Sequence, residues 1–541
     1  KQDESKATSA PIIKKEMAKI SFHDMTAEEV HNAVRGFYPW PVAFFISGGK
    51  RIKIIKSRVV NMRGTAGTVL KSDSELIVAC RKEAVALETI QPEGSKPMTA
   101  KQYLCGRPIA LGTEIEDENA VNALMRVNCG AAYSNIVLNE VLAKSGLTGA
   151  DRALASALFY GVLDRKITLD YIISQFVKTP VKKIAPLTIN ALRTAVYQIY
   201  YMDKIPDSAA VNEAVKLVKG SKESGNAGFV NAVLRNILRN RVELPCGSDI
   251  KSLSVKYSCP AAIVGSFVKD YGTETAKQLL IASLDTPPLT VRVNTLKISA
   301  EELAEKLEEQ GITAEISEDK NALVLKHCSD ISENEFYKSG FFYAQDLASQ
   351  RAVGTADPKP GERVLDICAA PGGKSFTAAM LMQNAGEIIS CDLYEQRVRL
   401  IESGAKRLGT SIIKPKTANA EIYDEALGEF DLVLCDVPCS GLGVLRRKPE
   451  IKYKDICLDD TLTQTQLKIL ENAARYVKTG GRILYSTCTL RQNENENLVN
   501  SFIMRYNMFR KAYEHTYMPH IDKTDGFYCA LLIKEGNAPL E

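Results

Sequence analysis

The sequence predicts a chain of several domains that ends in a doubly wound, Rossmann-like α/β sheet. In its last third, short apolar runs alternate with helical patterns, which is typical of a mostly parallel sheet with right-handed crossovers. A small-residue turn at residues 369–374 directly follows the first of these runs. Polar or sulfur-bearing residues follow two later runs. Because open α/β sheets bind ligands at the carboxyl ends of their strands, we expect the functional site at this edge.

The elements of this sheet can be placed along the chain. Strands are expected at residues 363–368, 387–391, 412–416, 430–435 and 482–485. Helices are expected between or after them, at about 374–382, 394–408, 462–477 and 494–504. This order brings Cys439 and Cys488 to the ends of two strands.

Composition limits the class of protein. The chain has 541 residues, of which 45% are hydrophobic and 25% charged, enough for roughly three or four globular domains. The net charge of +4 does not by itself indicate a nucleic-acid partner. Thirteen cysteines without a zinc-type C-x-x-C pair favour a reducing cytoplasm over a disulfide framework or a metal site.

The sequence shows no transmembrane segment and no secretion signal. Apolar runs stay below the ~18 residues of a transmembrane helix, and the polar N-terminus lacks a signal-peptide pattern. We therefore expect a cytoplasmic protein with no membrane association. Because the chain begins at Lys1, we also expect a processed or truncated start.

Residues 1–112 predict a small β-barrel. Strand patterns occur at 43–47, 51–60, 68–70, 75–80 and 84–90, after a helix at 27–35. Gly48 and Gly49 supply a hairpin turn between the first two. The only tryptophan, Trp40, is expected to plug the core at a barrel corner.

An all-helical bundle is predicted next, at residues 119–241. Tyr133, Val137 and Val141 share one helical face, and Thr148 with Asp151 resembles a capping box. Further helices are expected up to about residue 165 and at 169–176, 186–201, 208–219 and 228–239. Basic side chains in the bundle either follow phosphates or form a solvated face, and charge alone leaves both open: Lys216, Lys219, Lys222, Arg235, Arg239 and Arg241.

Residues 242–345 predict a small α/β subdomain between the bundle and the sheet. It is expected to contain a strand at 289–293, a helix at 300–310 and a second strand at 322–325.

The glycine turn excludes two common ligands. A P-loop requires G-x-x-x-x-G-K-[ST], and its first glycine would fall on Cys368. Residues 369–374 do not supply the G-x-G-x-x-G of a dinucleotide site either. Asp392 ends the next strand about twenty positions on, which suits ribose hydroxyls. An adenosine cofactor without phosphates is S-adenosylmethionine, with a generic nucleotide fold as the alternative.

Two cysteines extend this interpretation. A single cysteine is most often a small buried core residue, but Cys439 and Cys488 each follow a strand beside the expected cofactor. Methylation of cytosine at C5 needs a thiolate that adds to C6, and a base that later removes the C5 proton. Two cysteines at neighbouring strand ends match this requirement.

Specific motifs carry a resemblance to a known family. Residues 366–375, 436–443 and 485–490 resemble the RNA 5-methylcytosine methyltransferases. Residues 159–165, 192–198, 211–215 and 228–235 resemble the NusB-type RNA-binding domain. Together with 342–350 and 524–528, they make residues 119–541 similar to the bacterial 16S rRNA members of that family. The segment with Arg292, Val293 and Asn294 resembles the RNA-clamping subdomain of the same enzymes.

The resemblance implies roles for individual residues. It makes Cys488 the nucleophile and Cys439 the group that assists product release. It places Asp392 at the ribose and Asp436 between cofactor and base. Asn419 stands where the family usually has an acid that contacts the cofactor, so cofactor affinity is the property affected. The turn residues that would line S-adenosylmethionine are Cys368, Ala369, Ala370, Pro371, Gly372, Gly373 and Lys374.

Three cations follow the Cys439 loop. As a hypothesis, Arg446, Arg447 and Lys448 hold the RNA backbone and lower the pKa of Cys488. A solvated loop is the alternative.

A second resemblance covers the N-terminal part. Residues 20–22, 34–41, 64–69 and 87–94 resemble the C-terminal domain of methionyl-tRNA formyltransferase. This implies an OB-like barrel that binds tRNA but has no formyl-transfer chemistry, as a fusion of neighbouring genes would produce.

The function expected from these features is methylation of C5 of a cytosine in 16S rRNA, with S-adenosylmethionine as cofactor, by a monomer. Two alternatives stay open, namely a non-catalytic RNA-binding scaffold and a formyltransferase remnant fused to the methyltransferase.

Overall fold

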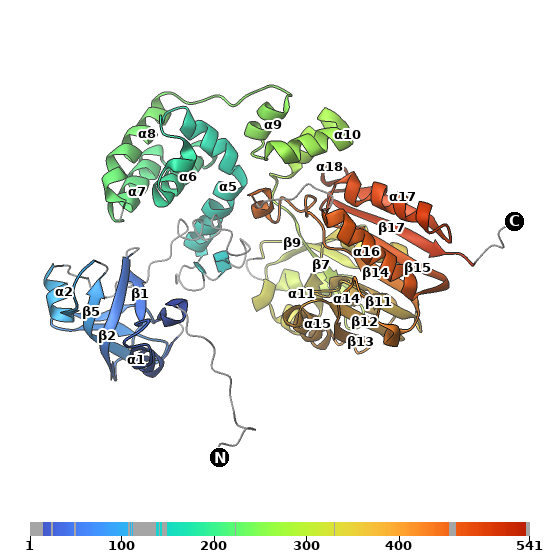
Figure 1. The fold of residues 1–541 in the computed structure, drawn as a ribbon, viewed down its shortest axis with the longest axis horizontal. Coiled ribbons are helices and arrows are strands. Elements are labelled where there is room, and N and C mark those ends of the chain that lie inside the picture. The colour runs from blue at the N-terminus through green and yellow to red at the C-terminus, as the bar shows by residue number, and fades with distance from the viewer. Residues whose placement is uncertain are drawn as a thin grey trace, which may run out of the picture. The chain divides into compact units, whose positions relative to one another are not determined.

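A computed structural model describes most of the chain in two compact units, Lys1–Glu243 and Leu244–Glu541 (Figure 1). The residues that it describes are 15–22, 25–47, 50–92, 94–106, 109, 111, 137–139, 141–142, 149–221, 223–328, 331–453 and 461–536. Along the described residues, no helix combines the length and the apolar character that a membrane crossing requires.

The N-terminal part of the first unit is an antiparallel sheet with the strand order β1-β2-β5-β4-β3, with β6 added on β5. Its elements are α1 (Ala27–Gly36), β1 (Phe44–Ser47), β2 (Lys50–Val60), β3 (Val69–Ser72), β4 (Leu76–Ala79), β5 (Ala84–Pro92), β6 (Met98–Thr99) and α2 (Ala100–Gly106). The expected strands and the first helix are confirmed, whereas β6 and α2 were not predicted. Closure into an OB-like barrel stays a prediction.

One expectation for this part is wrong. Trp40 does not plug the core, because 57% of its surface is exposed. The core is instead filled by side chains of the strands and of the segment before α1, including Phe22 and Phe45, whose rings meet edge to face at 5.3 Å.

The helical part of the first unit includes α5 (Gly149–Ser174), α6 (Pro186–Tyr201), α7 (Asp207–Lys219) and α8 (Ala227–Arg239) (Figure 1), and the described residues 137–139 and 141–142 before them are also helical. The helices expected from residue 186 onward are confirmed within one residue. The separate helix expected at 169–176 is wrong, because α5 runs through to Ser174. Residues 165–168 contain no glycine or proline that would interrupt its hydrogen bonds. Tyr133, Thr148 and Lys222 lie outside the described residues.

The second unit begins with a helical pair and a small sheet. Its elements are α9 (Ile250–Lys256), α10 (Ala261–Ala282), β7 (Leu289–Val293), α11 (Ala300–Glu309), β8 (Thr313–Ile316), β9 (Ala322–Lys326), α12 (Glu335–Lys338) and β10 (Phe342–Ala344). The sheet is antiparallel with the order β10-β7-β9-β8. The expected β7, α11 and β9 are confirmed. Strands β8 and β10 and helices α9 and α10 were not predicted.

The remainder of the second unit is the predicted α/β sheet, with the order β13-β12-β11-β14-β15-β17-β16. Its strands are β11 (Arg363–Asp366), β12 (Glu387–Asp392), β13 (Ile413–Thr417), β14 (Phe430–Asp436), β15 (Val477–Thr487), β16 (Phe509–Tyr517) and β17 (Phe527–Lys534). Pairs from β13 to β15 are parallel, and β17 pairs antiparallel with β15 and β16. The mostly parallel sheet is confirmed, and the antiparallel extension was not predicted.

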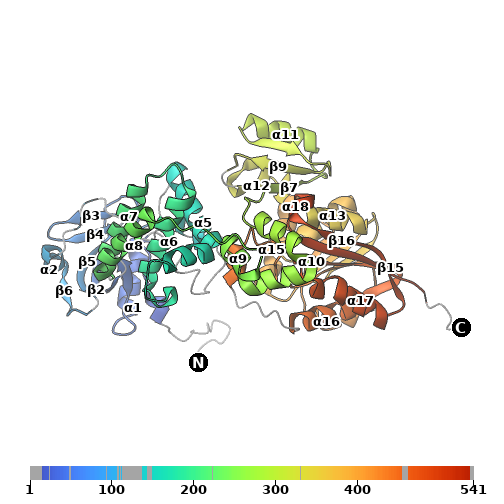
Figure 2. The same ribbon diagram turned by 90° about the horizontal axis from the view of Figure 1, so that it is seen from above.

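Helices cover both faces of this sheet. They are α13 (Leu347–Ala356), α14 (Gly373–Leu381), α15 (Glu395–Leu408), α16 (Thr461–Tyr476) and α17 (Glu496–Arg505), whereas the short helix α18 (Pro519–Asp522) contacts α10. Successive strand residues such as Val364 and Leu365 point into different clusters, one with α13, α14 and α15 and the other with α16 and α17. Figure 2 shows α13 on one side of the strands and α16 and α17 on the other.

The strand order defines where a ligand can approach. Strand β11 pairs with β12 on one side and with β14 on the other, so the chain reverses its winding direction at β11. The crevice at the carboxyl end of such a strand is the usual ligand site of this fold. The glycine turn starts there.

Candidate active site

The glycine turn joins β11 to α14 and includes Cys368, which is half-buried beyond the strand end. Its conformation is fixed by backbone hydrogen bonds from Ala369 N to Cys391 O and from Gly372 N to Ala369 O, both 2.7 Å. Gly372 has a φ of +109°, and a Cβ there would lie 2.5 Å from the ring of Phe376. The turn therefore requires glycine at this position.

Asp392 ends β12 beside the turn and is 4% exposed. Its Oδ2 accepts a hydrogen bond from Ala370 N at 3.3 Å. Arg397 contacts the same oxygen at 3.3 Å and donates to Ala370 O at 2.7 Å. The structure thus brings Asp392 to the turn as predicted, and adds Arg397, which the sequence pattern did not single out.

Lys374 and Asp436 form an ion pair across the turn, with 2.7 Å between Nζ and Oδ2. The Lys374 side chain is only 11% exposed. Burial acts to lower its pKa, but the charge and the hydrogen bond of Asp436, together with the charges of Asp366 and Cys488, outweigh burial, so the pKa is raised. Ser486 donates to the other oxygen of Asp436 at 2.8 Å. Lys374 is therefore held as a cation that faces the end of β14.

Asp366, the last residue of β11, is a buried acid that the sequence interpretation did not use. Its Oδ2 accepts from Ser375 at 2.7 Å, whereas its buried Oδ1 has no hydrogen-bond partner among the described residues. Burial raises the pKa of Asp366 to about 7.

The residues around the turn fit a cationic cofactor. Carboxylates end β12 and β14 beside the turn, namely Asp392 and Asp436, whereas Asp366 at the end of β11 is fully buried. Two cations near the turn are already paired with carboxylates, Lys374 with Asp436 and Arg397 with Asp392. Such a set suits ribose hydroxyls together with the positive sulfonium and amino groups of S-adenosylmethionine, and it does not suit a phosphate chain.

Asn419 lies two residues beyond β13 and is exposed. Its Oδ1 accepts a hydrogen bond from Glu421 N at 3.0 Å. The neighbouring Ala418 N donates to Asp392 O, also at 3.0 Å. Asn419 therefore belongs to a segment that is hydrogen-bonded to the strand end of Asp392.

Cys439 and Cys488 follow β14 and β15, and their sulfur atoms lie within hydrogen-bond distance at 3.0 Å. Donation from Cys439 lowers the pKa of Cys488, and the charges of Lys448 and Lys374 act in the same direction, against burial and Asp436. The pKa of Cys439 is raised by this hydrogen bond, by burial and by the nearby negative charges. Cys488 is therefore the sulfur that favours the thiolate, and Cys439 is the thiol.

Of the hypothesis for the three cations after Cys439, the effect of Lys448 on the pKa of Cys488 is supported. The part on the two arginines needs a correction, and contact with the RNA backbone stays a prediction. Arg446 is paired with Asp525 at 2.8 Å, and Arg447 contacts the other oxygen of the same carboxylate. Arg447 also pairs with Asp346 at 3.2 Å. These arginines hold loops together, and the cations that act on Cys488 are Lys448 and Lys374.

The Cys488 loop also packs against two glycines. Gly443 N donates to Cys488 O at 3.0 Å, and Gly526 N donates to Gly443 O at 2.9 Å. A Cβ on Gly443 would lie 1.9 Å from Gly526 O. Both glycines fall within the motifs at 436–443 and 524–528, and the close contact of the two backbones explains why glycine stands at both positions.

Comparison with known families accounts for most of the chain. The family described as 16S rRNA methyltransferase RsmB/F matches residues 353–533, and the ferredoxin-like domain of RsmF/B-like methyltransferases matches 259–332. The NusB family matches 117–239, and the C-terminal domain of formyl transferases matches 12–108. The resemblances expected from the sequence are confirmed. Fold and matches together define an S-adenosylmethionine-dependent RNA methyltransferase.

Individual relatives identify the family within this class of methyltransferases. A probable ribosomal RNA small subunit methyltransferase B of Bacillus subtilis (strain 168) is 36% identical over 439 residues, which are 77% of this chain and 98% of that protein. Ribosomal RNA small subunit methyltransferase B of Photorhabdus laumondii is 30% identical, over 73% of this chain and 94% of that protein. The crystal structure of PH0851 has a TM-score of 0.66 at 28% identity, over 77% of this chain and 98% of that one. The chain belongs to the ribosomal RNA small subunit methyltransferase B family.

Proposed function

We propose that this protein methylates C5 of a cytosine in 16S rRNA and that Cys488 forms a transient covalent bond to C6 of that base. The observation that carries the proposal is the approach of Cys439 and Cys488 to 3.0 Å beside the glycine turn. Relatives named as ribosomal RNA small subunit methyltransferase B support the choice of RNA. The pair supplies one thiolate and one thiol, and these are the two states that the chemistry needs.

The first half of the reaction uses Cys488. Its thiolate adds to C6, the C5–C6 double bond gives up its electron pair, and C5 becomes nucleophilic. S-adenosylmethionine, when bound, supplies the electrophilic methyl group that C5 accepts. The target base must leave its stack to reach the two sulfurs.

The second half uses Cys439. Once the sulfur of Cys488 is bonded to carbon, it no longer accepts the hydrogen bond that is the largest cause of the raised pKa of Cys439. Cys439 then loses its proton to water, and the resulting thiolate removes the proton from C5. The electron pair restores the C5–C6 double bond, and the S–C6 bond breaks with its electrons on Cys488. One proton is released to solvent in the whole cycle.

The residues of the turn would hold the cofactor. In this proposal Cys368, Ala369, Ala370, Pro371, Gly372, Gly373 and Lys374 line it. Asp392 binds the ribose, Asn419 lies near it, and Asp436 separates the cofactor from the base. Lys374 keeps Asp436 ionised and oriented through the 2.7 Å ion pair.

The other parts of the chain would deliver RNA to this edge. Residues 346–541 form the catalytic domain, and 119–241 and 242–345 form NusB-like and clamp-like RNA-binding domains. Residues 1–112 form an OB-like barrel that binds tRNA, and the protein acts as a monomer in the cytoplasm. The family matches support the domain types, whereas tRNA binding, the monomer and the cytoplasmic location rest on the sequence interpretation alone.

Methyl transfer tests the proposal directly. The full chain, mixed with small-subunit rRNA and S-adenosylmethionine labelled with tritium in the methyl group, should place the label on C5 of one cytosine. A pure RNA-binding scaffold would bind the RNA without transfer.

Covalent trapping tests the roles of the cysteines. Cys439→Ala should accumulate an RNA–protein adduct that survives a denaturing gel, because attack continues while release is slowed. Cys488→Ala should form none. Adducts in both variants, or in neither, would contradict the assignment of Cys488 as nucleophile and Cys439 as the group that assists release.

A further inference from the structure

Two adjacent polar residues, Glu494 and Asn495, lie just before α17 on the chain segment that follows Cys488. Both side chains are fully buried, with 0% exposure. A buried carboxylate is costly unless other groups pair with it. The groups that pair with these two side chains come from the two cysteine loops, from Gln466 in α16 and from Arg491.

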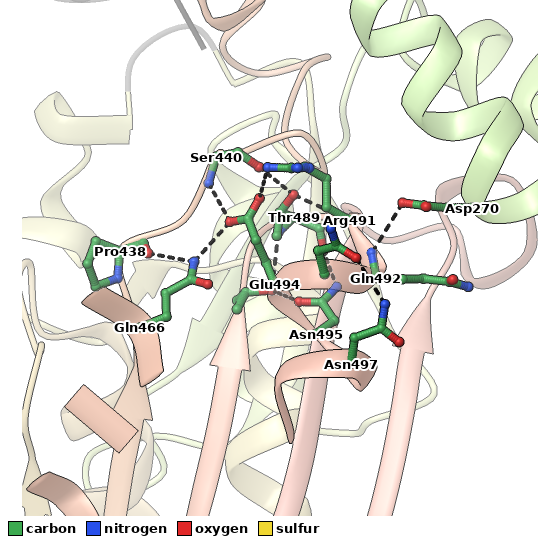
Figure 3. A network of polar contacts seen from close by, with 12 residues as sticks. Asp270, Pro438, Ser440, Gln466, Thr489, Arg491, Gln492, Glu494, Asn495 and Asn497 are labelled. Atoms are coloured by element: carbon green, nitrogen blue, oxygen red, sulfur yellow. Dashed lines mark hydrogen bonds and ion pairs between the residues drawn. The ribbon is translucent and has the colours of Figure 1, made fainter. Parts of the chain in front are cut away.

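Glu494 holds the segment that contains Cys439. Its Oε2 accepts hydrogen bonds from Ser440 N and from Gln466 Nε2, both at 2.9 Å. Gln466 Nε2 also donates to Pro438 O at 2.9 Å. Figure 3 shows Glu494 between these groups and Arg491. The residues on both sides of Cys439 are therefore fixed through one carboxylate.

Asn495 holds the segment that contains Cys488 in a parallel way. Its Oδ1 accepts from Thr487 Oγ1 at 2.6 Å, and its Nδ2 donates to Thr489 O at 3.0 Å. The residues on both sides of Cys488 are thus fixed through one amide. These hydrogen bonds of Asn495 are separate from those that Glu494 makes.

Further contacts fix the two cysteine loops relative to each other. Arg491 contacts Glu494 Oε1 at 3.2 Å, and Tyr485 at the end of β15 donates to Glu494 O at 2.7 Å. The hydroxyl groups of Ser440 and Thr489 join the two loops at 2.7 Å. Because Glu494 and Asn495 are neighbours in the chain, the spacing of the two loops is set by one short segment.

We propose that Glu494 and Asn495 are positioning residues that each hold one of the two cysteines, Glu494 for the release step and Asn495 for the attack step. The inference rests on the proposed function. Among the described residues, neither side chain is hydrogen-bonded to a sulfur atom, so each acts through the residues that flank its cysteine. The charge of Glu494 also contributes to the raised pKa of Cys439, which supports its link to that thiol.

Single-turnover kinetics with rRNA and S-adenosylmethionine separate the two steps. Adduct formation is followed on denaturing gels, and release is followed by the disappearance of the adduct and the appearance of free methylated RNA. A displacement of a reacting group by about 1 Å can lower a rate about 100-fold. We therefore expect Glu494→Ala to slow release by roughly 10- to 100-fold and to leave attack nearly unchanged. Asn495→Ala should slow attack by a similar factor.

Matched variants separate positioning from folding. Asn497→Ala removes an exposed amide from the same helix and should leave both steps unchanged. Glu494→Gln keeps an oxygen for Ser440 N and Gln466 and loses the charge that faces Arg491. Asn495→Asp keeps the oxygen that faces Thr487. Both should show the same step-specific effects, reduced in size, even if the alanine variants fail to fold.

A combined variant tests whether Glu494 acts through Cys439. In Cys439→Ala protein the group that Glu494 positions is already absent, so adding Glu494→Gln should slow release no further. Additive slowing, or equal slowing of both steps by the Glu494 and Asn495 variants, would overturn the inference. If Cys439→Ala forms no adduct and the unaltered protein transfers no methyl group, the proposed function itself is wrong, and the positioning role is rejected with it. If that adduct forms but Glu494→Gln releases RNA at the unaltered rate, only the positioning role fails.

Discussion

The sulfur atoms of Cys439 and Cys488 lie 3.0 Å apart although 49 positions separate them in the chain. The register of the sheet explains this approach. Strands β14 and β15 are parallel neighbours, and Asp436 pairs with Ser486 at their carboxyl ends. Cys439 comes three residues after Asp436, and Cys488 comes two after Ser486. The two loops therefore leave the sheet side by side, and one S–H bond lies between their sulfurs.

The shared hydrogen bond makes the pKa of Cys488 depend on Cys439. Cys439→Ala removes the donor that stabilises the Cys488 thiolate, so the pKa of Cys488 should rise. Because only the thiolate reacts with iodoacetamide, the pH profile of alkylation at Cys488 should move to higher pH. Peptide mapping by mass spectrometry measures it. An unchanged or lower midpoint would contradict the hydrogen-bond assignment.

The other groups that act on Cys488 stay in place in this variant, since Lys374, Lys448 and Asp436 are not altered. Alkylation of Cys246, which is exposed and remote in sequence, serves as the internal control. It should be the same in both proteins.

A second prediction separates the cations after the Cys439 loop. Lys448→Ala should raise the pKa of Cys488, because a positive charge near the thiolate is lost. Lys448 is exposed, so the shift should shrink as salt is added. The same alkylation profile, recorded at low and high salt, measures both effects.

Arg447→Ala is the matched comparison. This arginine is tied to Asp525 and Asp346, so its loss should leave the Cys488 profile unchanged. It should instead lower the free energy of unfolding by about 1–3 kcal/mol, because buried acceptors lose a partner. A shifted profile in Arg447→Ala would restore the original hypothesis for the arginines.

Much of the sheet could be predicted because its central strands are short apolar runs separated by helical patterns. The antiparallel end could not be predicted as easily. Strand β16 reads FRKAYEHTY, a charged edge strand in which no apolar run appears. Strand β17 reads FYCALLIK, an apolar run from which a strand can be predicted. Helix α5 was divided because its middle is polar, although nothing there breaks a helix.

The candidate site shows the same division between local and long-range signals. Motif position alone placed Cys439, Cys488, Asp392 and the turn at one edge. No local pattern showed that Lys374 would pair with Asp436, because such partners meet only after folding. Glu494 resembles an ordinary acid at a helix start, and its burial among the donors of Ser440, Gln466 and Arg491 is visible only in the structure.

A third prediction concerns the Lys374–Asp436 pair. Lys374→Met leaves Asp436, which is 31% exposed, without its partner and should lower the free energy of unfolding by about 2–3 kcal/mol. Lys359→Ala is the control, because its pair with Asp357 is exposed on both sides and should matter by less than about 1 kcal/mol. Adding Asp436→Asn to Lys374→Met should recover part of the loss. A purely additive double variant would mean that the two side chains do not interact in solution.

The last prediction concerns the crossing of Gly443 with Gly526. In Gly443→Ala the new methyl group would lie 1.9 Å from Gly526 O and 2.9 Å from Cys488 O. These are backbone atoms that cannot rotate away, so the loop that carries Cys488 must move. We expect adduct formation to fall by roughly 100-fold. Gly354→Ala is the control, since nothing lies within 4 Å of a Cβ at that exposed site in α13, and it should stabilise by up to about 1 kcal/mol. Unaltered adduct formation in Gly443→Ala would show that the backbone crossing does not position Cys488.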